Sequence, residues 1–365
     1  MKKILILHTS VGLGHKSIAE NISATLVDAG FVVQLEDILK VEQGRLVSIS
    51  TALHGFINQS VPWLWAWLYQ SEWFTNLTLP YRTWVAGKNY QNTKMVIDGF
   101  QPDCIISTQT SASAVVAYLK QKGLYKGQFG IAFSDFHLHK YWLYQEANFY
   151  LVNIDEQKQG MVELGIDQRK IFVCGIMLPK KVAVNASEIR QKLRIPPENK
   201  IMLLASGSMG LKINENFISY FSKKEGITTI VVCGKNQKTY DNLSKQFLGT
   251  NCIILGYYKP MSELYVIADL FITKPGGLSI AEALAWKLPI LISHLLPGQE
   301  ELNYEYLLDN GLVMPEPFAL EASAEEELAT GSFRADIQKN EALSKISPKP
   351  EVLLNCFTGV TSNRF

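Results

Sequence analysis

The stretch from Ile272 to Glu282 constrains the fold of this chain most, because it reads as a strand end, a tight glycine turn and a helix start. Pro275 would end the strand, and Gly276-Gly277 can adopt backbone angles closed to other residues and let a ligand approach. Ser279 and the free N–H groups of the first helical turn would form an anion site, strengthened by the helix dipole. Glu282, one turn further, could accept hydrogen bonds from a vicinal diol. Phosphates at a helix end, beside a carboxylate for a ribose, predict a nucleotide pocket, although many glycine-rich α/β turns bind nothing.

The beginning of the chain predicts a doubly wound parallel sheet. Lys3–His8 is a short apolar run, residues 9–15 form a glycine-containing loop, Ser17–Ala29 has a helical period and Phe31–Glu36 reads as a second strand. This order of strand, loop, helix and strand is typical of an α/β fold.

The first loop does not match the common nucleotide-binding patterns. Ser17 stands where a dinucleotide fingerprint has its third glycine, and His15 stands where a P-loop has its final glycine. The loop therefore reads as a flexible turn in which Gly14 leads to His15 at the carboxyl edge of the sheet, where ligands of open α/β sheets bind. A lone histidine is usually structural, but a glycine-flanked one at this edge predicts a catalytic or ligand-contacting role.

The second half of the chain repeats this order of strands and glycine loops. Ile201–Ala205 reads as a strand and runs into a second glycine loop at residues 206–210, and further strands follow at Thr228–Cys233, Cys252–Leu255 and Asp269–Thr273. A chain of 365 residues is long enough to form two α/β domains. We therefore expect two Rossmann-like doubly wound domains facing a cleft, residues 1–178 and 179–365. Beyond about residue 314 the chain reads as acidic and irregular, and only residues 348–357 suggest a helix that crosses back to the first domain.

Composition limits the partners and the compartment. A formal charge of +1 does not favour nucleic acid, and five cysteines without metal-ligand spacing indicate buried thiols in a reducing cytoplasm. The first apolar run is too short for a signal peptide. Residues 46–71 carry no charged side chain, yet Gly55, Asn58 and Pro62 interrupt this stretch too often for a transmembrane helix.

A tryptophan-rich segment predicts contact with a membrane surface. Trp63 and Trp67 share a helical face, Trp65 broadens the apolar arc, and tryptophan favours the bilayer interface. Residues 81–142 carry seven basic and three acidic side chains, an excess that suits anionic headgroups. The alternative is a core helix packed under the sheet.

A further polar cluster follows the apolar run Phe129–Phe133. Asp135, His137 and His139 could suggest a metal, but no further ligands follow at a suitable spacing. We therefore expect an acid/base or substrate-orienting role and no metal site.

Several motifs together resemble the monogalactosyldiacylglycerol synthase and diacylglycerol glucosyltransferase family. Ser10-x-Gly12-x-Gly14-His15 resembles its N-terminal motif, and Pro62-x-Leu64-Trp65-x-x-Leu68-Tyr69 and Asp135-x-x-x-His139-x-x-Trp142 look like its acceptor-domain motifs. Residues 273–282, with Pro297-Gly298-Gln299-Glu300-Glu301 and Asn303, are similar to its donor-domain signature. More distantly, the chain is similar to the N-acetylglucosaminyltransferase that makes peptidoglycan lipid II.

The resemblance implies a GT-B enzyme at the cytoplasmic face of the cell membrane that transfers hexose from a UDP-sugar to diacylglycerol, with inversion and without an essential metal or cofactor. Its first domain would bind the lipid acceptor and its second the donor. His15, or else Asp135, would act as the base. The resemblance assigns donor-binding roles to Ser208, Tyr257, Gly276, Gly277, Ser279, Glu282, Gln299, Glu300 and Asn303, and acceptor or membrane roles to Gly14, Trp63, Trp65, Trp67, His139 and Trp142.

Other functions stay open on the sequence alone. A Rossmann oxidoreductase would use the first loop with Asp37, but the missing third glycine and the second nucleotide site count against it. An N-acetylglucosamine transferase acting on a polyprenyl-linked acceptor, or a catalytically silent lipid-binding GT-B protein, would share the motifs. The sequence does not distinguish a galactose donor from a glucose donor.

Overall fold

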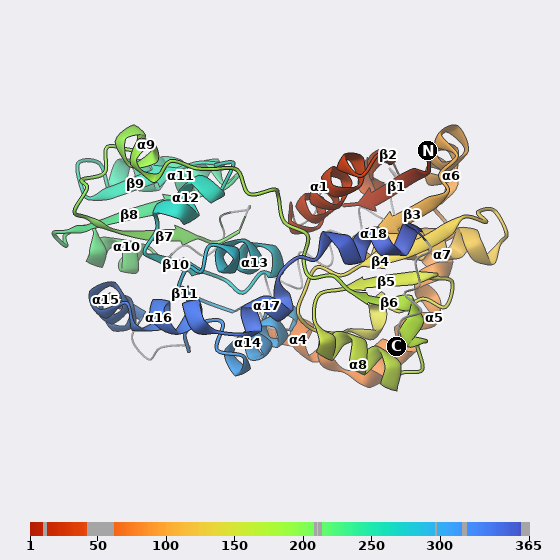
Figure 1. The fold of residues 1–365 in the computed structure, drawn as a ribbon. Helices are drawn as coiled ribbons and strands as arrows, with labels where there is room; N and C mark the ends of the chain where they lie inside the picture. Colours follow the sequence, from red (N-terminus) through yellow and green to blue (C-terminus); the bar gives the residue numbers. More distant parts are fainter. Residues whose placement is uncertain are drawn as a thin grey trace. The chain divides into compact units, whose positions relative to one another are not determined.

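The computed structural model describes residues 1–9, 13–41, 62–207, 210, 214–295, 298–315 and 320–358. The chain divides into two compact units, each built around a parallel sheet (Figure 1). The first unit comprises Met1–Pro179, Leu296–Leu302 and Lys345–Phe365, and the second comprises Lys180–Leu295 and Asn303–Ser344.

The first unit holds a six-stranded sheet in the order β2-β1-β3-β4-β5-β6, with all pairs parallel. The chain leaves β1 first towards β2 and later returns on its other side to β3, so the winding direction reverses between β1 and β3. In doubly wound sheets, the carboxyl edge at such a reversal is where ligands bind. The strands are β1 (Lys3–His8), β2 (Val32–Asp37), β3 (Cys104–Ser107), β4 (Gln128–Ala132), β5 (Phe149–Val152) and β6 (Ile171–Val173).

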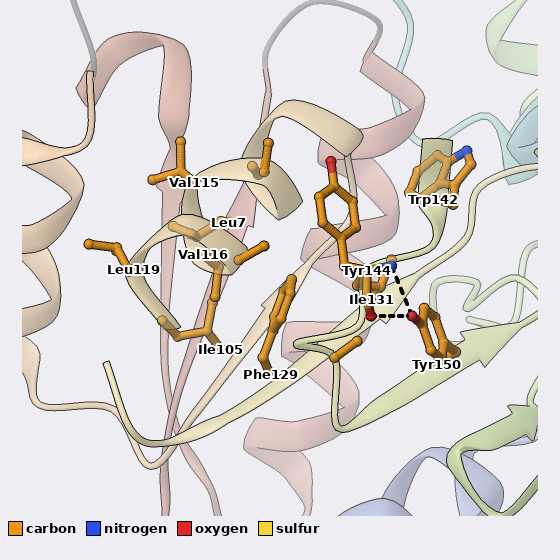
Figure 2. Packing of buried hydrophobic residues seen from close by; sticks show 14 of the residues in the cluster. Leu7, Ile105, Val115, Val116, Leu119, Phe129, Ile131, Trp142, Tyr144 and Tyr150 are labelled. Atoms are coloured by element: carbon orange, nitrogen blue, oxygen red, sulfur yellow. Dashed lines mark hydrogen bonds between the residues drawn. The ribbon is translucent and has the colours of Figure 1, made fainter. Parts of the chain in front are cut away.

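One face of this sheet is covered by a core that Figure 2 shows from close by. Val116 and Leu119 of α7 pack with Ile105 of β3 and with Phe129 and Ile131 of β4. Because neighbouring residues of a strand point to opposite faces, the uninterrupted apolar runs of β1 and β3 bury side chains on both. The helices of this unit are α1 (Leu13–Asp28), α2 (Ile38–Val41), α4 (Pro62–Gln70), α5 (Glu72–Ala86), α6 (Gln91–Phe100), α7 (Thr110–Gln121), α8 (Asp155–Glu163) and α18 (Pro350–Thr358), with short 3-10 turns η1 (Lys140–Trp142) and η2 (Gln168–Lys170).

The second unit holds a five-stranded parallel sheet in the order β11-β10-β7-β8-β9. Its winding direction reverses between β7 and β10, so the glycine loops that follow these two strands meet at one edge. The strands are β7 (Lys200–Ala205), β8 (Ile227–Val232), β9 (Cys252–Leu255), β10 (Leu270–Thr273) and β11 (Ile290–Ile292). The helices are α9 (Ala186–Lys192), α10 (Glu215–Phe221), α11 (Gln237–Gln246), α12 (Ser262–Ile267), α13 (Gly277–Ala285), α14 (Gln299–Asp309), α15 (Leu320–Thr330), α16 (Ser332–Lys339) and α17 (Ala342–Ile346), the first turn of α14 and the end of α17 being grouped with the first unit.

The expectation of an irregular chain beyond residue 314 is wrong, because α15, α16 and α17 fill most of this region. Glu327 of α15 is buried and accepts hydrogen bonds from the backbone N–H groups of Phe333 and Arg334, so an acidic residue holds the start of α16. A carboxylate at a helix N-terminus is stabilising. The spacing of hydrophobic residues does not predict such a contact, because the residue involved is acidic.

Helix α18 occupies the place where residues 348–357 suggested a closing helix. The Lys349 backbone N–H donates to the Cys174 carbonyl at 2.7 Å, and Lys2 Nζ donates to the Phe357 carbonyl at 2.7 Å. The Phe357 ring lies 5.4 Å from that of Phe31, measured between ring centroids. The last described helix therefore belongs to the first unit, whose first segment ends at Pro179.

Candidate active site

His15 lies at the winding reversal of the first sheet, in the first turn of α1. Gly14 and His15 are helical rather than part of a flexible turn, because α1 begins at Leu13. The His15 carbonyl accepts a hydrogen bond from Thr108 Oγ1 at 3.1 Å, which joins α1 to the residue that follows β3. Within the described ranges, the buried His15 Nδ1 has no hydrogen-bond partner.

Burial decides the protonation state of His15. Removal from water lowers the pKa of this imidazole, and the negative charge of Asp135 opposes that shift without overcoming it. A neutral imidazole can accept a proton, so His15 is electrostatically suited to act as a base near neutral pH.

Asp135 follows β4 and is only 6% exposed. Its Oδ2 accepts hydrogen bonds from Ser134 Oγ and from Gln299 Nε2, both at 2.7 Å. Its backbone carbonyl accepts from Asn153 Nδ2 and Gln157 Nε2, both at 2.8 Å. Asp135 is thus buried, and hydrogen bonds to both its carboxylate and its backbone carbonyl hold it in place. The sequence did not single out Asn153 or Gln157, since an amide near a strand end carries no distinctive signal.

His139 braces the loop that carries Asp135. Its Nδ1 accepts the Tyr141 backbone N–H at 3.2 Å, so the proton resides on Nε2, which donates to the Tyr69 carbonyl at 2.8 Å. The Tyr69 ring stacks on His139 at 4.2 Å, and the Tyr69 hydroxyl bonds His137 Nε2 at 2.8 Å. These contacts tie the loop to the end of α4.

Trp142 lies inside this site rather than on the protein surface. It is 7% exposed and belongs to the buried cluster that Figure 2 shows. Its ring centroid lies 5.1 Å from that of Phe133 and 6.2 Å from that of His15. The first unit therefore brings together His15, Asp135, Trp142 and Gln299. His139, in the loop that follows Asp135, bonds the Tyr69 carbonyl.

An exposed aromatic surface covers α4 and α5. Trp63 and Trp67 of α4 are 69% and 58% exposed, whereas the side chain of Trp65 lies outside the described residues. On α5, four exposed residues at helical spacing extend this surface: Trp73, Leu77, Tyr81 and Trp84. Large exposed apolar patches mark sites of interaction. The i, i+4, i+8, i+11 spacing of the α5 stripe is the sequence signal that identifies it.

The second candidate site lies at the winding reversal of the second sheet. Gly276 is the N-cap of α13, no side chain caps the helix there, and a Cβ atom on Gly276 would contact nothing in the described part of the protein. Gly207, in the loop after β7, has a positive φ of 66°, and its Cβ position would lie 3.1 Å from Lys274 Cε. The two glycine loops and a lysine thus converge beside the N-terminus of a helix, a geometry suited to a diphosphate. No separate sequence signal points to Lys274, whose side chain lies beside both glycine turns.

Glu282 lies in the same helix, half-buried, with Ser279 half-buried one turn before it. Burial raises the pKa of Glu282 to about 7, against the opposing effects of the Tyr265 hydroxyl, 3.4 Å from Oε2, and of Lys259. The carboxyl group therefore titrates near neutral pH.

The other expected donor residues take varied positions. Tyr257 is exposed, with Lys235 Nζ 5.8 Å from its ring centroid. Asn303 is buried, and its Nδ2 donates to the Pro275 carbonyl at 3.1 Å, so it braces the glycine turn. Glu300 is also buried, and Ser208 lies outside the described residues.

Within the described ranges, no group of three His, Cys, Asp or Glu side chains is placed to hold a metal ion. In the same part of the chain, no helix combines the length and the apolar character that a membrane span requires.

Comparisons with known proteins agree with this architecture. Residues 15–178 match the family described as monogalactosyldiacylglycerol (MGDG) synthase, and residues 185–342 match glycosyl transferases group 1. A processive diacylglycerol beta-glucosyltransferase of Bacillus subtilis (strain 168) is 28% identical over 330 residues, which cover 85% of this chain and 82% of the relative. A protein of the same name from Bacillus cytotoxicus is 26% identical over 358 residues, covering 95% and 91%.

Two solved structures share the fold. The UDP-GlcNAc 2-epimerase from Neisseria meningitidis bound to UDP-GlcNAc has a TM-score of 0.61 at 13% identity and covers 97% of this chain and 99% of its own. The calicheamicin glycosyltransferase CalG4 has a TM-score of 0.61 at 11% identity and covers 99% of both chains.

Two Rossmann-like domains, each with a parallel sheet whose winding direction reverses, define the fold as that of the GT-B glycosyltransferases. The chain carries a monogalactosyldiacylglycerol synthase domain over residues 15–178 and a group 1 glycosyl transferase domain over residues 185–342, and the two relatives named above are diacylglycerol glucosyltransferases. The family resemblance of the sequence motifs is thereby confirmed.

Proposed function

We propose that this protein transfers a hexose from a UDP-sugar to the sn-3 hydroxyl of diacylglycerol at a membrane surface. The observation that carries the proposal is that one chain combines a diphosphate-type turn next to Glu282 with a buried His15–Asp135 site in a unit that exposes an aromatic surface. The names of the relatives favour glucose as the donor sugar and diacylglycerol as the acceptor.

In the proposed reaction, the neutral His15 imidazole accepts the proton of the lipid hydroxyl. The hydroxyl oxygen attacks the anomeric carbon from the face opposite UDP, the bond from that carbon to the diphosphate oxygen breaks, and the anomeric configuration inverts. The charge of Asp135 stabilises the imidazolium that forms, since it already acts to raise the pKa of His15. A positioned base of this kind contributes about 10²–10⁴-fold to the rate. Asp135 is the second candidate for the base.

On the donor side, the N-terminus of α13 and Lys274 would bind the diphosphate and stabilise UDP as it leaves. Glu282 would accept hydrogen bonds from the ribose hydroxyls, and the exposed Tyr257 ring would lie against the uracil. With Lys274 and helix N–H groups to neutralise the phosphates, we propose that transfer needs no metal ion. Ser208, Ser279, Glu300 and Asn303 complete the proposed donor set.

The aromatic surface of α4 and α5 would place the protein on the bilayer interface as a peripheral protein. Tryptophan and tyrosine rings favour the headgroup level, and Lys88, whose Nζ lies 4.8 Å from the Trp84 ring centroid, adds positive charge for anionic lipid. All five cysteines are free thiols, which suits the cytoplasmic face.

The proposal is tested with purified protein and liposomes that contain diacylglycerol or a polyprenyl-phosphate-linked acceptor. Each liposome is incubated with UDP-glucose, UDP-galactose or UDP-N-acetylglucosamine, and lipid products are identified by mass spectrometry. We expect hexosyl-diacylglycerol, and longer incubation shows whether a second hexose is added. A product only on the polyprenyl carrier would replace the proposed acceptor, and liposome binding without any turnover would indicate a lipid-binding protein without activity.

A further inference from the structure

The first turn of α14 belongs to the first unit and contacts two other segments of that unit. Gln299 Nε2 donates to Asp135 Oδ2 at 2.7 Å, and Gln70 Nε2 donates to Glu301 Oε2 at 3.3 Å. A Cβ atom on Gly298 would lie 3.5 Å from the Cα atom of Ala66, so the backbone before α14 packs directly against α4.

The local backbone explains why Gln299 points where it does. Gly298 has a φ of 98°, a left-handed conformation that favours glycine, and its N–H donates to Glu301 Oε2 at 2.8 Å. The Glu301 carboxylate therefore caps its own helix while it also accepts from Gln70. With the start of the helix fixed in this way, the side chain of Gln299 reaches the buried carboxylate of Asp135.

We infer that Gln299 is a positioning residue for Asp135, and that its contribution to catalysis comes through this carboxylate rather than through a hydrogen bond to the transferred sugar. The inference rests on the proposed function, and it departs from the role that the family resemblance implies for Gln299. Ser134 Oγ and Gln299 Nε2 donate to the same oxygen, Oδ2, and together they fix the rotation of the carboxylate.

The orientation of this carboxylate matters because its charge acts on two other groups of the site. Asp135 raises the pKa of His15 against the effect of burial, and it adds to the raised pKa of Tyr69. His8, in β1, acts on His15 in the opposite direction to Asp135. Asp135 thus stabilises positive charge on His15 when the proposed base accepts its proton, and a hydrogen bond to the Thr108 backbone acts in the same direction.

The two roles for Gln299 predict different kinetics for Gln299→Ala in the full-length protein. A positioning role predicts that kcat falls by about tenfold to hundredfold, the effect of losing a hydrogen bond to a charged group, while KM for UDP-glucose stays within about twofold. Calorimetry should give equal UDP-glucose affinities for Gln299→Ala and wild type, which also shows that the variant is folded. Glu305→Ala, at an exposed position of the same helix, is the matched control and should leave both constants unchanged.

A double-mutant cycle with Asp135→Ala tests whether Gln299 acts through Asp135. The low residual turnover of these variants is measured from the product that accumulates. If Gln299 acts through Asp135, adding Gln299→Ala to Asp135→Ala costs little further activity. The inference is overturned if Gln299→Ala weakens UDP-glucose binding while kcat is retained, or if its effect is the same in both backgrounds. Failure of the proposed function is distinguishable, because wild-type protein would then form no glycolipid although the UDP-glucose affinities could still be compared.

Discussion

Raising the pH from 6 to 8 should strengthen UDP-glucose binding, because Glu282 gains its negative charge over that range. Burial raises the pKa of Glu282 from its ordinary value to about 7, and a carboxylate must be ionised to accept hydrogen bonds from both ribose hydroxyls. Because folding raises this pKa, the native state holds more protons than the unfolded state between the ordinary value of 4.5 and about 7. Glu282 therefore makes the unliganded protein less stable as the pH rises through this interval.

The size of the effect follows from the fraction of Glu282 that is ionised. With a pKa of about 7, that fraction is about one-tenth at pH 6 and about nine-tenths at pH 8. If only the ionised form binds the ribose, the dissociation constant for UDP-glucose should fall by about tenfold over these two pH units.

Isothermal titration calorimetry at constant ionic strength measures this change. UDP-glucose is a suitable ligand because neither of its phosphates titrates between pH 6 and 8, so the charge of the ligand is constant. Glu282→Gln keeps the shape of the side chain but removes its titration, and its affinity should be flat across the range. The reasoning is refuted if wild-type affinity is flat, or if Glu282→Gln keeps the wild-type slope.

Three further outcomes are expected. Replacing Trp73 and Trp84 by serine should weaken liposome binding in flotation assays by about tenfold or more while changing the free energy of unfolding by less than about 1 kcal/mol, since both rings are exposed; unchanged flotation would remove α5 from the proposed membrane surface. EDTA should leave the rate of hexose transfer unchanged, and a loss restored by added Mg²⁺ or Mn²⁺ would contradict the proposed role of Lys274. Phe129→Ala should lower the free energy of unfolding by about 3–5 kcal/mol in urea titration, because Phe129 is fully buried in the core of the first unit; a change below about 1 kcal/mol would show that this core is not packed as described.

The two sheets could be predicted because parallel strands leave an uninterrupted apolar run in the sequence. Ile4–His8 and Leu270–Thr273 are buried on both faces, and each is followed by a glycine-containing segment and a helix. The same argument placed His15 and Gly276 at carboxyl strand ends, which is where the structure has them.

The remaining features depend on contacts that no local pattern contains. The hydrogen bond between Gln299 and Asp135 joins residues far apart in the chain, and the burial of Trp142 against Phe133 depends on how its loop folds back. His139 shows the same limit, because a histidine that braces a loop and one that contacts a ligand look alike in sequence.

The most direct test of the central claim compares wild-type protein with His15→Ala on liposomes that contain diacylglycerol and UDP-glucose. Mass spectrometry should show diacylglycerol carrying one added hexose for the wild type, and a loss of about 10²-fold or more in its rate of formation for His15→Ala at equal UDP affinity. Absence of the glycolipid with wild-type protein, or a normal rate with His15→Ala, would contradict the account.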